Sequence, residues 1–306
     1  MAQKSKSTLR LTSRGGNKME IIKNEKTAEI VGLCFGDGSL TRRHSGKNKG
    51  KLRFQMRGHI IEDREHYDNY VKPLLDEIIG RIPTTIYRGK KPYYGVSTES
   101  SIICDYLVSL GVPVGVKREL KVPEWIFENK YFIKGFLRGF FDTDGCIFCQ
   151  KSYNTKNNLH RLVKIIFGSI SSELINDTHS LLKKIGIKSI VKNPLLHKEK
   201  NWKTLHILRI ESNKDVERWF DIIGSNNPKH ITKFNVWKQF GFCPPHTNIE
   251  QRRKMLNKEI NPTLFYNKKE YAGVAEPGQM RKVEVANQKP YPLVGARVRI
   301  TSPAYN

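Results

Sequence analysis

Acidic residues are scarce in this chain of 306 residues. It has 29 Asp and Glu against 54 Lys and Arg, so the formal net charge is +25. A positive excess of this size is unusual for an enzyme of small-molecule metabolism, and it indicates a polyanionic partner, most commonly nucleic acid. A basic structural protein would satisfy the charge equally well, so charge alone assigns no activity. Hydrophobic residues make up 38% of the chain, enough to fill one large or two medium domains.

Long apolar runs are also absent, because none approaches the roughly 20 residues of a membrane-spanning helix. The first residues, "MAQKSKSTLRLTSRGGNK", are basic and lack the apolar core of a secretory signal. We therefore expect residues 1–22 to form a basic arm and the protein not to be secreted. The expected location is the cytoplasm or nucleoid of a prokaryote, or the matrix of an organelle.

Cysteine is sparse: five residues at scattered positions argue against a disulfide framework and fit a reducing compartment. Cys146 and Cys149 are spaced C-x-x-C, and Cys243 and His246 are spaced C-x-x-H, so four zinc ligands exist in principle. The first pair lies in "CIFCQ", which has the composition of a strand, where residues three apart point to opposite faces. This spacing therefore disfavours a zinc site.

One short stretch is present twice. "VGLCFGDGSL", residues 31–40, reads as the end of an apolar helix, although each internal glycine costs a helix about 1 kcal/mol relative to alanine. "LRGFFDTDG", residues 137–145, has the same pattern. A weak helix that ends in a carboxylate and occurs twice requires a reason other than helix stability.

The two stretches align residue by residue, with Gly32 opposite Gly139, Gly36 opposite Thr143, and Asp37 opposite Asp144. Small residues four apart lie on one helix face, where they allow two backbones to approach closely. We therefore expect these two helices to pack against each other about a pseudo-two-fold axis. Their carboxylates then meet at two helix C-termini, where the macrodipole disfavours negative charge and a divalent cation would relieve it.

The rest of the chain repeats around these helices. Gly80 follows Asp37 by 43 residues and Gly186 follows Asp144 by 42, and each glycine ends a second helix. Both segments read as helix, two strands, helix, two strands, helix. The sequence predicts an α+β fold of two pseudo-symmetric αββαββα halves, each with an antiparallel sheet. The expected boundaries are 1–22 for the arm, 23–128 and 129–246 for the halves, and 247–306 for a C-terminal tail, poorly ordered from about residue 272.

The strand "KLRFQMR" alternates strictly, with Lys51, Arg53, Gln55 and Arg57 on one face and apolar residues on the other. A β-ribbon fits the major groove of DNA, where Arg and Lys pair with guanine and Gln with adenine. A soluble sheet face usually has mixed charge, and this face has no acid. The other expected DNA-binding residues are Arg42, Arg43, Arg88, Lys90, Lys151, Lys164, Lys192 and Arg209.

The doubled motif resembles the two motifs of single-chain LAGLIDADG homing endonucleases, over roughly residues 25–245. This resemblance implies a saddle of two DNA-binding sheets joined at a two-helix interface. It implies one essential acid at the eighth motif position, here Asp37 and Asp144. At the sixth position Phe35 replaces an acid, whereas the second motif keeps Asp142. The implied metal ligands are Asp37, Asp144, Gly36 and Thr143, and the implied cofactor is Mg²⁺ or another divalent metal.

Members of that family also carry a basic residue about 80 positions past each acid. Lys117 matches this pattern in the first half, and in the second half either Lys229 or His230 does. The implied catalytic set is Asp37, Asp144, Lys117 and Lys229. In this pattern, each acid serves one strand of a duplex.

The resemblance implies a monomeric, site-specific nuclease that makes a double-strand break in a long DNA target and promotes mobility of its intron or host element. The ends of the chain, Met1 and "AYN", lack the residues that protein self-splicing needs, so we expect a free-standing enzyme. Two alternatives remain open: an intron RNA maturase on the same fold, and a catalytically decayed DNA-binding protein.

Overall fold

The computed structural model describes residues 8–10, 20–89, 92–152, 159–195 and 204–266. Lys90 and the expected tail from residue 272 lie outside these ranges. Before the first half, β1 (Thr8–Arg10) pairs antiparallel with β2 (Glu20–Ile22), inside the expected arm. None of the helices described is long and apolar enough to cross a membrane.

The first half has the expected order of elements. They are α1 (Glu25–Gly36), β3 (Gly38–Arg42), β4 (Leu52–His59), a helix formed by α2 (Arg64–His66), one π-helical turn (Tyr67–Val71) and α3 (Lys72–Ile79), then β5 (Thr84–Tyr87), β6 (Tyr93–Thr98) and α4 (Ser101–Ser109). The four strands form an antiparallel sheet in the order β3-β4-β6-β5. Gly80 follows α3 with a φ of 86°, a left-handed conformation that glycine adopts without strain.

The second half repeats this order. A 3₁₀ turn (Glu124–Glu128) leads into α5 (Lys130–Asp144), β7 (Cys146–Lys151), β8 (His160–Ser169), α6 (Ser172–Lys184), β9 (Ile190–Leu195), β10 (Leu205–Ile210) and α7 (Asn213–Ile222). The sheet order is β7-β8-β10-β9, which matches that of the first half. The predicted α+β duplication of αββαββα halves is confirmed.

Each sheet has one buried and one open face, as the alternation in β4 predicts. Phe54 and Met56 are fully buried, and α4 packs on this strand. In the second half Val163, Ile165 and Phe167 of β8 are buried in the same way, and α6 and α7 contact that sheet. The opposite faces are therefore the ones available to a partner, although Ile166 and Ile207 on that face of the second sheet are also buried.

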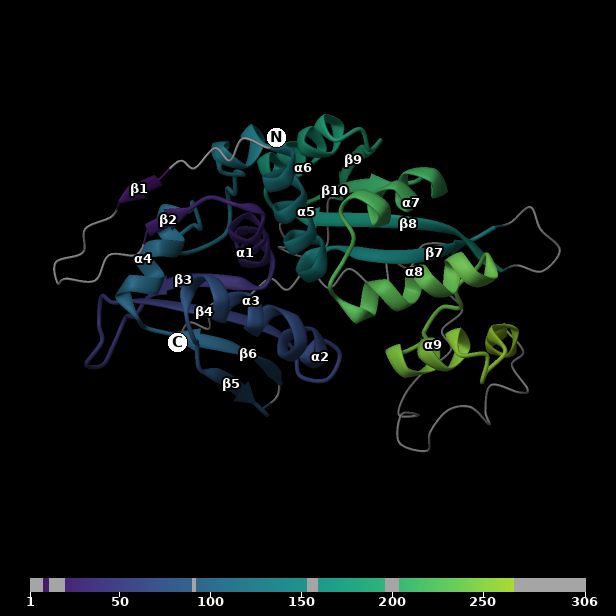
Figure 1. Ribbon diagram of the computed structural model, residues 1–306, viewed down its shortest axis with the longest axis horizontal. Helices are drawn as coiled ribbons and strands as arrows, with labels where there is room; N and C mark the ends of the chain where they lie inside the picture. Colours follow the sequence, from purple (N-terminus) through teal and green to yellow (C-terminus); the bar gives the residue numbers. More distant parts are fainter. Residues whose placement is uncertain (1–7, 11–19, 90–91, 153–158, 196–203, 267–306) are drawn as a thin grey trace, which may run out of the picture.

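The most extensive contact between elements of the described chain is that of α1 with α5, which lie side by side at the centre of the molecule (Figure 1). The glycines make it possible. A Cβ on Gly32 would overlap the carbonyl oxygen of Phe136 and lie 2.8 Å from the amide nitrogen of Phe140. A Cβ on Gly139 would overlap the carbonyl oxygen of Glu29 in the reciprocal way. These contacts are with backbone atoms, which cannot move aside as a side chain can.

The expected boundary at residue 246 lies inside a well-packed C-terminal extension. α8 (Pro228–Phe240) contacts β7, and α9 (Ile249–Leu256) packs on α8, followed by a 3₁₀ turn (Pro262–Tyr266). Arg252 of α9 is buried and donates from Nε to the Thr232 hydroxyl of α8 at 2.9 Å. Folded structure therefore continues at least to residue 266.

A Gly139→Ala substitution tests the glycine contact, because the contact decides whether the free energy of unfolding rises or falls. Replacing a glycine in a helix interior by alanine normally stabilises the helix by about 1 kcal/mol. Here the added methyl group meets the α1 backbone, and overpacking of this kind costs roughly 1–3 kcal/mol. We expect the free energy of unfolding, measured by chemical denaturation, to fall. Lys26→Ala on α1, where the lysine side chain is 52% exposed, is the control and should change it little. A more stable Gly139→Ala protein would contradict the contact.

Candidate catalytic centre and nucleic-acid face

The two motif acids stand at neighbouring helix ends. Asp37 is the residue that caps the C-terminus of α1, and Asp144 is the last residue of α5. A Cβ built on Gly36 would meet the Thr143 side chain and lie 3.3 Å from the amide nitrogen of Asp144. The Tyr67 hydroxyl donates to Asp37 Oδ2 at 3.2 Å. The helix packing therefore brings together the four residues expected to bind metal.

Lys117 reaches the same place from a distant segment. Its ammonium nitrogen donates hydrogen bonds to three consecutive carbonyl oxygens at the end of α1: those of Cys34, Phe35 and Gly36, at 2.7, 2.8 and 2.7 Å. Burial lowers the pKa of Lys117, and the carboxylates of Asp144 and Asp37 act against that effect. The last turn of α1 has no basic residue of its own, so Lys117 supplies the cation that the helix C-terminus favours.

Lys229 does not occupy the matching position in the second half. Its Nζ forms an ion pair at 3.0 Å with Asp63, which lies between β4 and α2 of the first half. Burial lowers the pKa of Lys229, but the Asp63 carboxylate outweighs burial and the net shift is upward. Lys229 thus joins the two halves beside the centre, and Asp37 contributes to its electrostatic environment.

The end of α5 is instead held by Asn227, a residue that our sequence reasoning missed. Its Nδ2 donates to the carbonyl oxygen of Asp142 at 2.8 Å. By the motif alignment, this oxygen corresponds to that of Phe35, one of the three that Lys117 holds. A neutral amide therefore takes part of the place that an ammonium takes in the first half. The spacing from the acid does not predict Asn227, because the family pattern has a basic residue at this place and Asn is neutral.

His230, the other residue considered, is buried, and its ring lies 4.4 Å from that of Phe141, centroid to centroid. Burial lowers the pKa of His230 well below its ordinary value. Within the described part of the chain, neither ring nitrogen has a hydrogen-bond partner. His230 therefore packs as a neutral ring in the core of the second half.

Asp142, the acid kept at the sixth motif position, is buried and organises the segment that carries Asn227. Its carboxylate accepts hydrogen bonds from the Ser225 hydroxyl at 2.5 Å and the Asn226 amide at 2.8 Å. Burial raises the pKa of Asp142 to about 7, although both hydrogen bonds act to lower it. Asp142 therefore contributes to the site indirectly, because it fixes the backbone next to Asn227.

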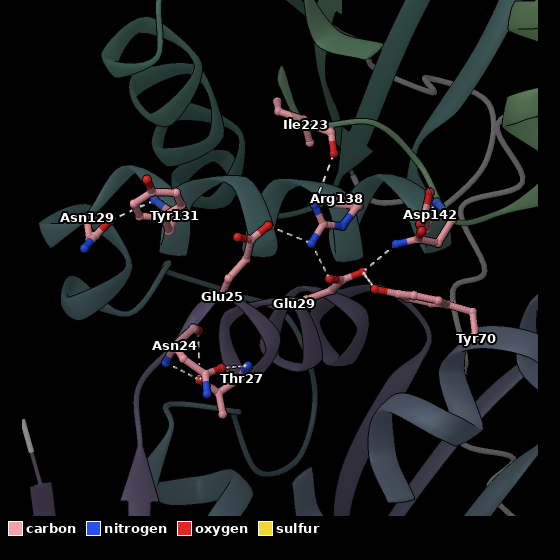
Figure 2. Close-up of polar contacts among 11 residues, drawn as sticks. Asn24, Glu25, Thr27, Glu29, Tyr70, Asn129, Tyr131, Arg138, Asp142 and Ile223 are labelled. Carbon is pink, nitrogen blue, oxygen red and sulfur yellow. Dashed lines mark hydrogen bonds and ion pairs between the residues drawn. The ribbon is translucent and has the colours of Figure 1, made fainter. Parts of the chain in front are cut away.

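A buried polar network crosses the helix pair (Figure 2). Glu29 of α1 has no exposed side-chain surface, and it pairs with Arg138 of α5 at 2.6 Å. The same carboxylate accepts from the Tyr70 hydroxyl at 2.7 Å and from Asn226 Nδ2 at 3.1 Å. Arg138 also pairs with Glu25 at 2.9 Å. Although burial opposes it, Glu29 raises the pKa of Arg138, so the guanidinium remains charged.

On the first sheet the predicted residues lie on the open face, but they differ in exposure. Gln55 is only 5% exposed and accepts a hydrogen bond from Arg57, so it lies beneath that guanidinium. Arg57 in turn stacks over the Tyr93 ring, 4.8 Å from its centroid. Arg53 donates from Nε to the Ser97 hydroxyl at 3.2 Å. The face therefore presents oriented donors together with an aromatic ring that sequence reasoning missed.

The remaining predicted residues of the first half lie around this face. Lys51 and Arg88 are exposed. Arg42 donates to the carbonyl oxygen of Gly50 at 3.1 Å, and Arg43 pairs with Glu99 at 3.4 Å.

On the second sheet three of the four predicted cations gather on one acid. Lys164, Lys192 and Arg209 lie 4.0, 3.1 and 3.8 Å from Oε1 of Glu211. Although burial opposes it, the three cations lower the pKa of Glu211. The fourth cation, Lys151, is exposed at the end of β7. The sequence pattern of basic residues did not reveal Glu211, because the contacts come from three different strands.

The centre can offer a divalent metal two carboxylates from opposite halves, and the Thr143 hydroxyl beside them donates to the carbonyl oxygen of Gly139 at 2.9 Å. The Gly36 carbonyl already accepts from Lys117. No cluster of three or more His, Cys, Asp or Glu side chains suited to a metal exists among the described residues. A metal here would therefore need water or substrate oxygens to complete its shell, as Mg²⁺ commonly does. Two hard oxygen ligands at a helix C-terminus fit that requirement.

Comparison with known proteins matches residues 132–224 to the model of the LAGLIDADG-like domain, in agreement with the resemblance seen in the second motif. A curated relative, the replication factor C small subunit of Methanocaldococcus jannaschii, is 22% identical over 210 residues, or 69% of this chain. The match spans only 10% of that protein.

Comparison with solved structures gives matches over about two thirds of this chain, of which three follow. The homing endonuclease I-DmoI in complex with DNA and Mn is 15% identical, with a TM-score of 0.46, over 65% of this chain and 96% of that one. The N-terminal LAGLIDADG domain of DUF199/WhiA is 18% identical, with a TM-score of 0.40, over 65% and 82%. I-WcaI bound to its DNA recognition sequence is 14% identical, with a TM-score of 0.40, over 66% and 81%.

The raised pKa of Asp142 predicts a pH dependence of stability. Since the folded carboxyl has a pKa of about 7 against an ordinary 3.8, the folded state binds more protons between these values. The stability it contributes is fully present below about pH 4 and is lost as the pH rises through 7. Asp142→Asn cannot titrate, so we expect the wild type to lose stability relative to this variant as pH rises from 4.5 to 8.

Denaturation curves of both proteins across that range provide the measurement. Asp105→Asn, at an exposed acid of α4, is the matched control and should track the wild type. A constant difference between wild type and Asp142→Asn at all pH values would show that Asp142 does not titrate in this window.

Proposed function

We propose that this chain, which carries a LAGLIDADG-like domain, is a site-specific endonuclease that cuts both strands of double-stranded DNA. The observation that carries the proposal is the meeting of Asp37 and Asp144 at adjacent helix ends, with the buried ammonium of Lys117 beside them. With one carboxylate from each of two related halves, each acid can serve one strand of a duplex. We further propose that the enzyme acts as a monomer and promotes mobility of its intron or host element.

Asp37 and Asp144 would hold a divalent metal, with Mg²⁺ the expected ion. When bound, such an ion polarises the scissile phosphate and lowers the pKa of bound water. The protein contributes rigid placement of its ligands, because the α1–α5 contact fixes the backbone at both acids. The macrodipoles of both helices add negative potential at this point, which favours a cation there.

Lys117 is suited to proton transfer at the same centre. It is buried and its pKa is lowered by that burial, so the neutral amine is more accessible than that of a surface lysine. In neutral form its Nζ can accept a proton from the attacking water. In charged form it can stabilise negative charge that develops on the phosphate. Three carbonyl oxygens accept all three N–H bonds of the ammonium and hold Nζ in place. The neutral amine keeps two of these hydrogen bonds, and its lone pair becomes the proton acceptor.

The open sheet faces would bind the DNA. The net charge of +25 favours association with a polyanion at long range. Arg53 and Arg57 stand among hydroxyl and amide groups that fix their guanidinium planes, as base recognition in the major groove requires. Binding should therefore combine steep salt dependence with sequence preference.

Substitution of the two acids tests the activity itself. The substrate is a duplex spanning the uninterrupted form of the locus that carries the coding sequence, incubated with Mg²⁺. We expect the wild type to cut it at one site, and Asp37→Asn or Asp144→Asn to reduce double-strand cleavage on the order of 10³-fold, because each removes a metal ligand. Asp105→Asn is the control of equal charge change. Specific binding without metal-dependent cleavage would indicate a decayed DNA-binding protein, and preference for the intron RNA would indicate a maturase.

A second pair of variants separates the two lysines. Lys117→Met should slow cleavage by about 10²–10⁴-fold with DNA affinity retained, because it removes a proton-transfer group. The wild-type rate should rise with pH as Lys117 loses its proton, and the variant should lack that dependence. Lys229→Met breaks the ion pair with Asp63, so its main effect should be on thermal stability. Single-turnover cleavage against pH provides the measurement, and equal rate losses in both variants would contradict the assignment.

A further inference from the structure

The cluster around Glu211 requires an explanation that phosphate binding does not provide. Lys164 of β8, Lys192 of β9 and Arg209 of β10 all point their charges at this one carboxylate. Its side chain is 27% exposed, so it remains accessible from the open face of the sheet. If this surface only bound the phosphates of a polyanion, an acid at its centre would weaken binding, because a carboxylate repels phosphate.

The first sheet has an acid at the matching position. Glu99 directly follows β6, as Glu211 directly follows β10, and these are the corresponding inner strands of the two sheets. Glu99 pairs with Arg43 at 3.4 Å and accepts from Asn48 Nδ2 at 2.5 Å. Both halves therefore place one carboxylate among donors on the same face, which argues against an accidental surface charge.

The Glu211 cluster lies near the catalytic end of its sheet. Cys146, two residues after Asp144, pairs with Ile166, and Ile166 pairs with Arg209. Lys164 lies two residues before Ile166 in β8, a distance of about 7 Å at the usual rise of a strand. A duplex bound along this face with a phosphate at the acids would therefore come within reach of Glu211.

We propose that Glu211 determines specificity, by accepting a hydrogen bond from the exocyclic amino group of a cytosine in the major groove. The inference depends on the proposed function and adds the base that one position reads. A carboxylate only accepts hydrogen bonds, so it fits the N4 amino group of cytosine and repels the O6 and N7 acceptors of guanine and the O4 of thymine. Adenine also has an amino group, at N6, but the N7 acceptor beside it repels a carboxylate, so cytosine is the better fit. The neighbouring cations remain available for phosphates or for guanines at adjacent steps. Recognition here includes rejection of wrong bases as well as attraction of the right one.

Selection from a partly randomised duplex library tests this proposal. The full chain is equilibrated with the library at moderate salt without Mg²⁺, and the bound DNA is sequenced. We expect the wild type to select cytosine at one position of the half-site bound by the second half. Glu211→Gln, which has nearly the same shape, should lose about tenfold or more of that preference. Its affinity for unrelated duplex should rise, because three cations are released from their acid.

Glu217→Gln, on α7, removes the same charge where the acid pairs with Lys238, and its selected sequence should match that of the wild type. A Glu211→Gln profile identical to the wild type overturns this inference and leaves the endonuclease proposal intact. Loss of preference at every position, or a lowered melting temperature with it, also overturns it, since that result indicates a structural role. A wild type that selects no sequence at all overturns the proposed function as well.

Discussion

The close approach of two helix backbones is the constraint on which the rest of this structure depends. α1 and α5 touch through Gly32 and Gly139, where even a methyl group would meet main-chain atoms. This contact brings two helix C-termini together and thereby brings Asp37 and Asp144 to one point. The glycines weaken each helix in isolation, and the pairing compensates for that weakness. The two acids meet because the helix backbones are in direct contact.

The two halves share their topology, but the side chains around their two acids differ. Both halves keep the same strand order and the same acid, because these depend on the shared helix pair. Around the acids, however, the halves differ: Lys117 holds the end of one helix and Asn227 the end of the other. Phe35 packs where Asp142 makes hydrogen bonds. A centre of this kind has two carboxylates in related positions and one buried amine, so its two sides are chemically unequal.

The sequence predicted the features that repeat with short periods or appear twice. Alternation in "KLRFQMR" identified the open face of β4, and glycines four residues apart identified the helix interface. The contacts it could not predict join residues that are far apart in the chain. Glu29 and Arg138 are separated by 109 positions, and Lys229 and Asp63 by 166. Lys229 is basic and lies at the expected spacing, and neither property determines which half its side chain reaches.

The network around Glu29 has a consequence for how such chains can be recombined. Glu29 and Tyr70 belong to the first half, whereas Arg138 and Asn226 belong to the second. A chimera that joins this first half to an unrelated second half would bury the Glu29 carboxylate without its guanidinium partner, and a buried charge left unpaired is strongly destabilising. The exchangeable unit is therefore each sheet with its loops. The central helices and the segment at residues 223–227 must be inherited together.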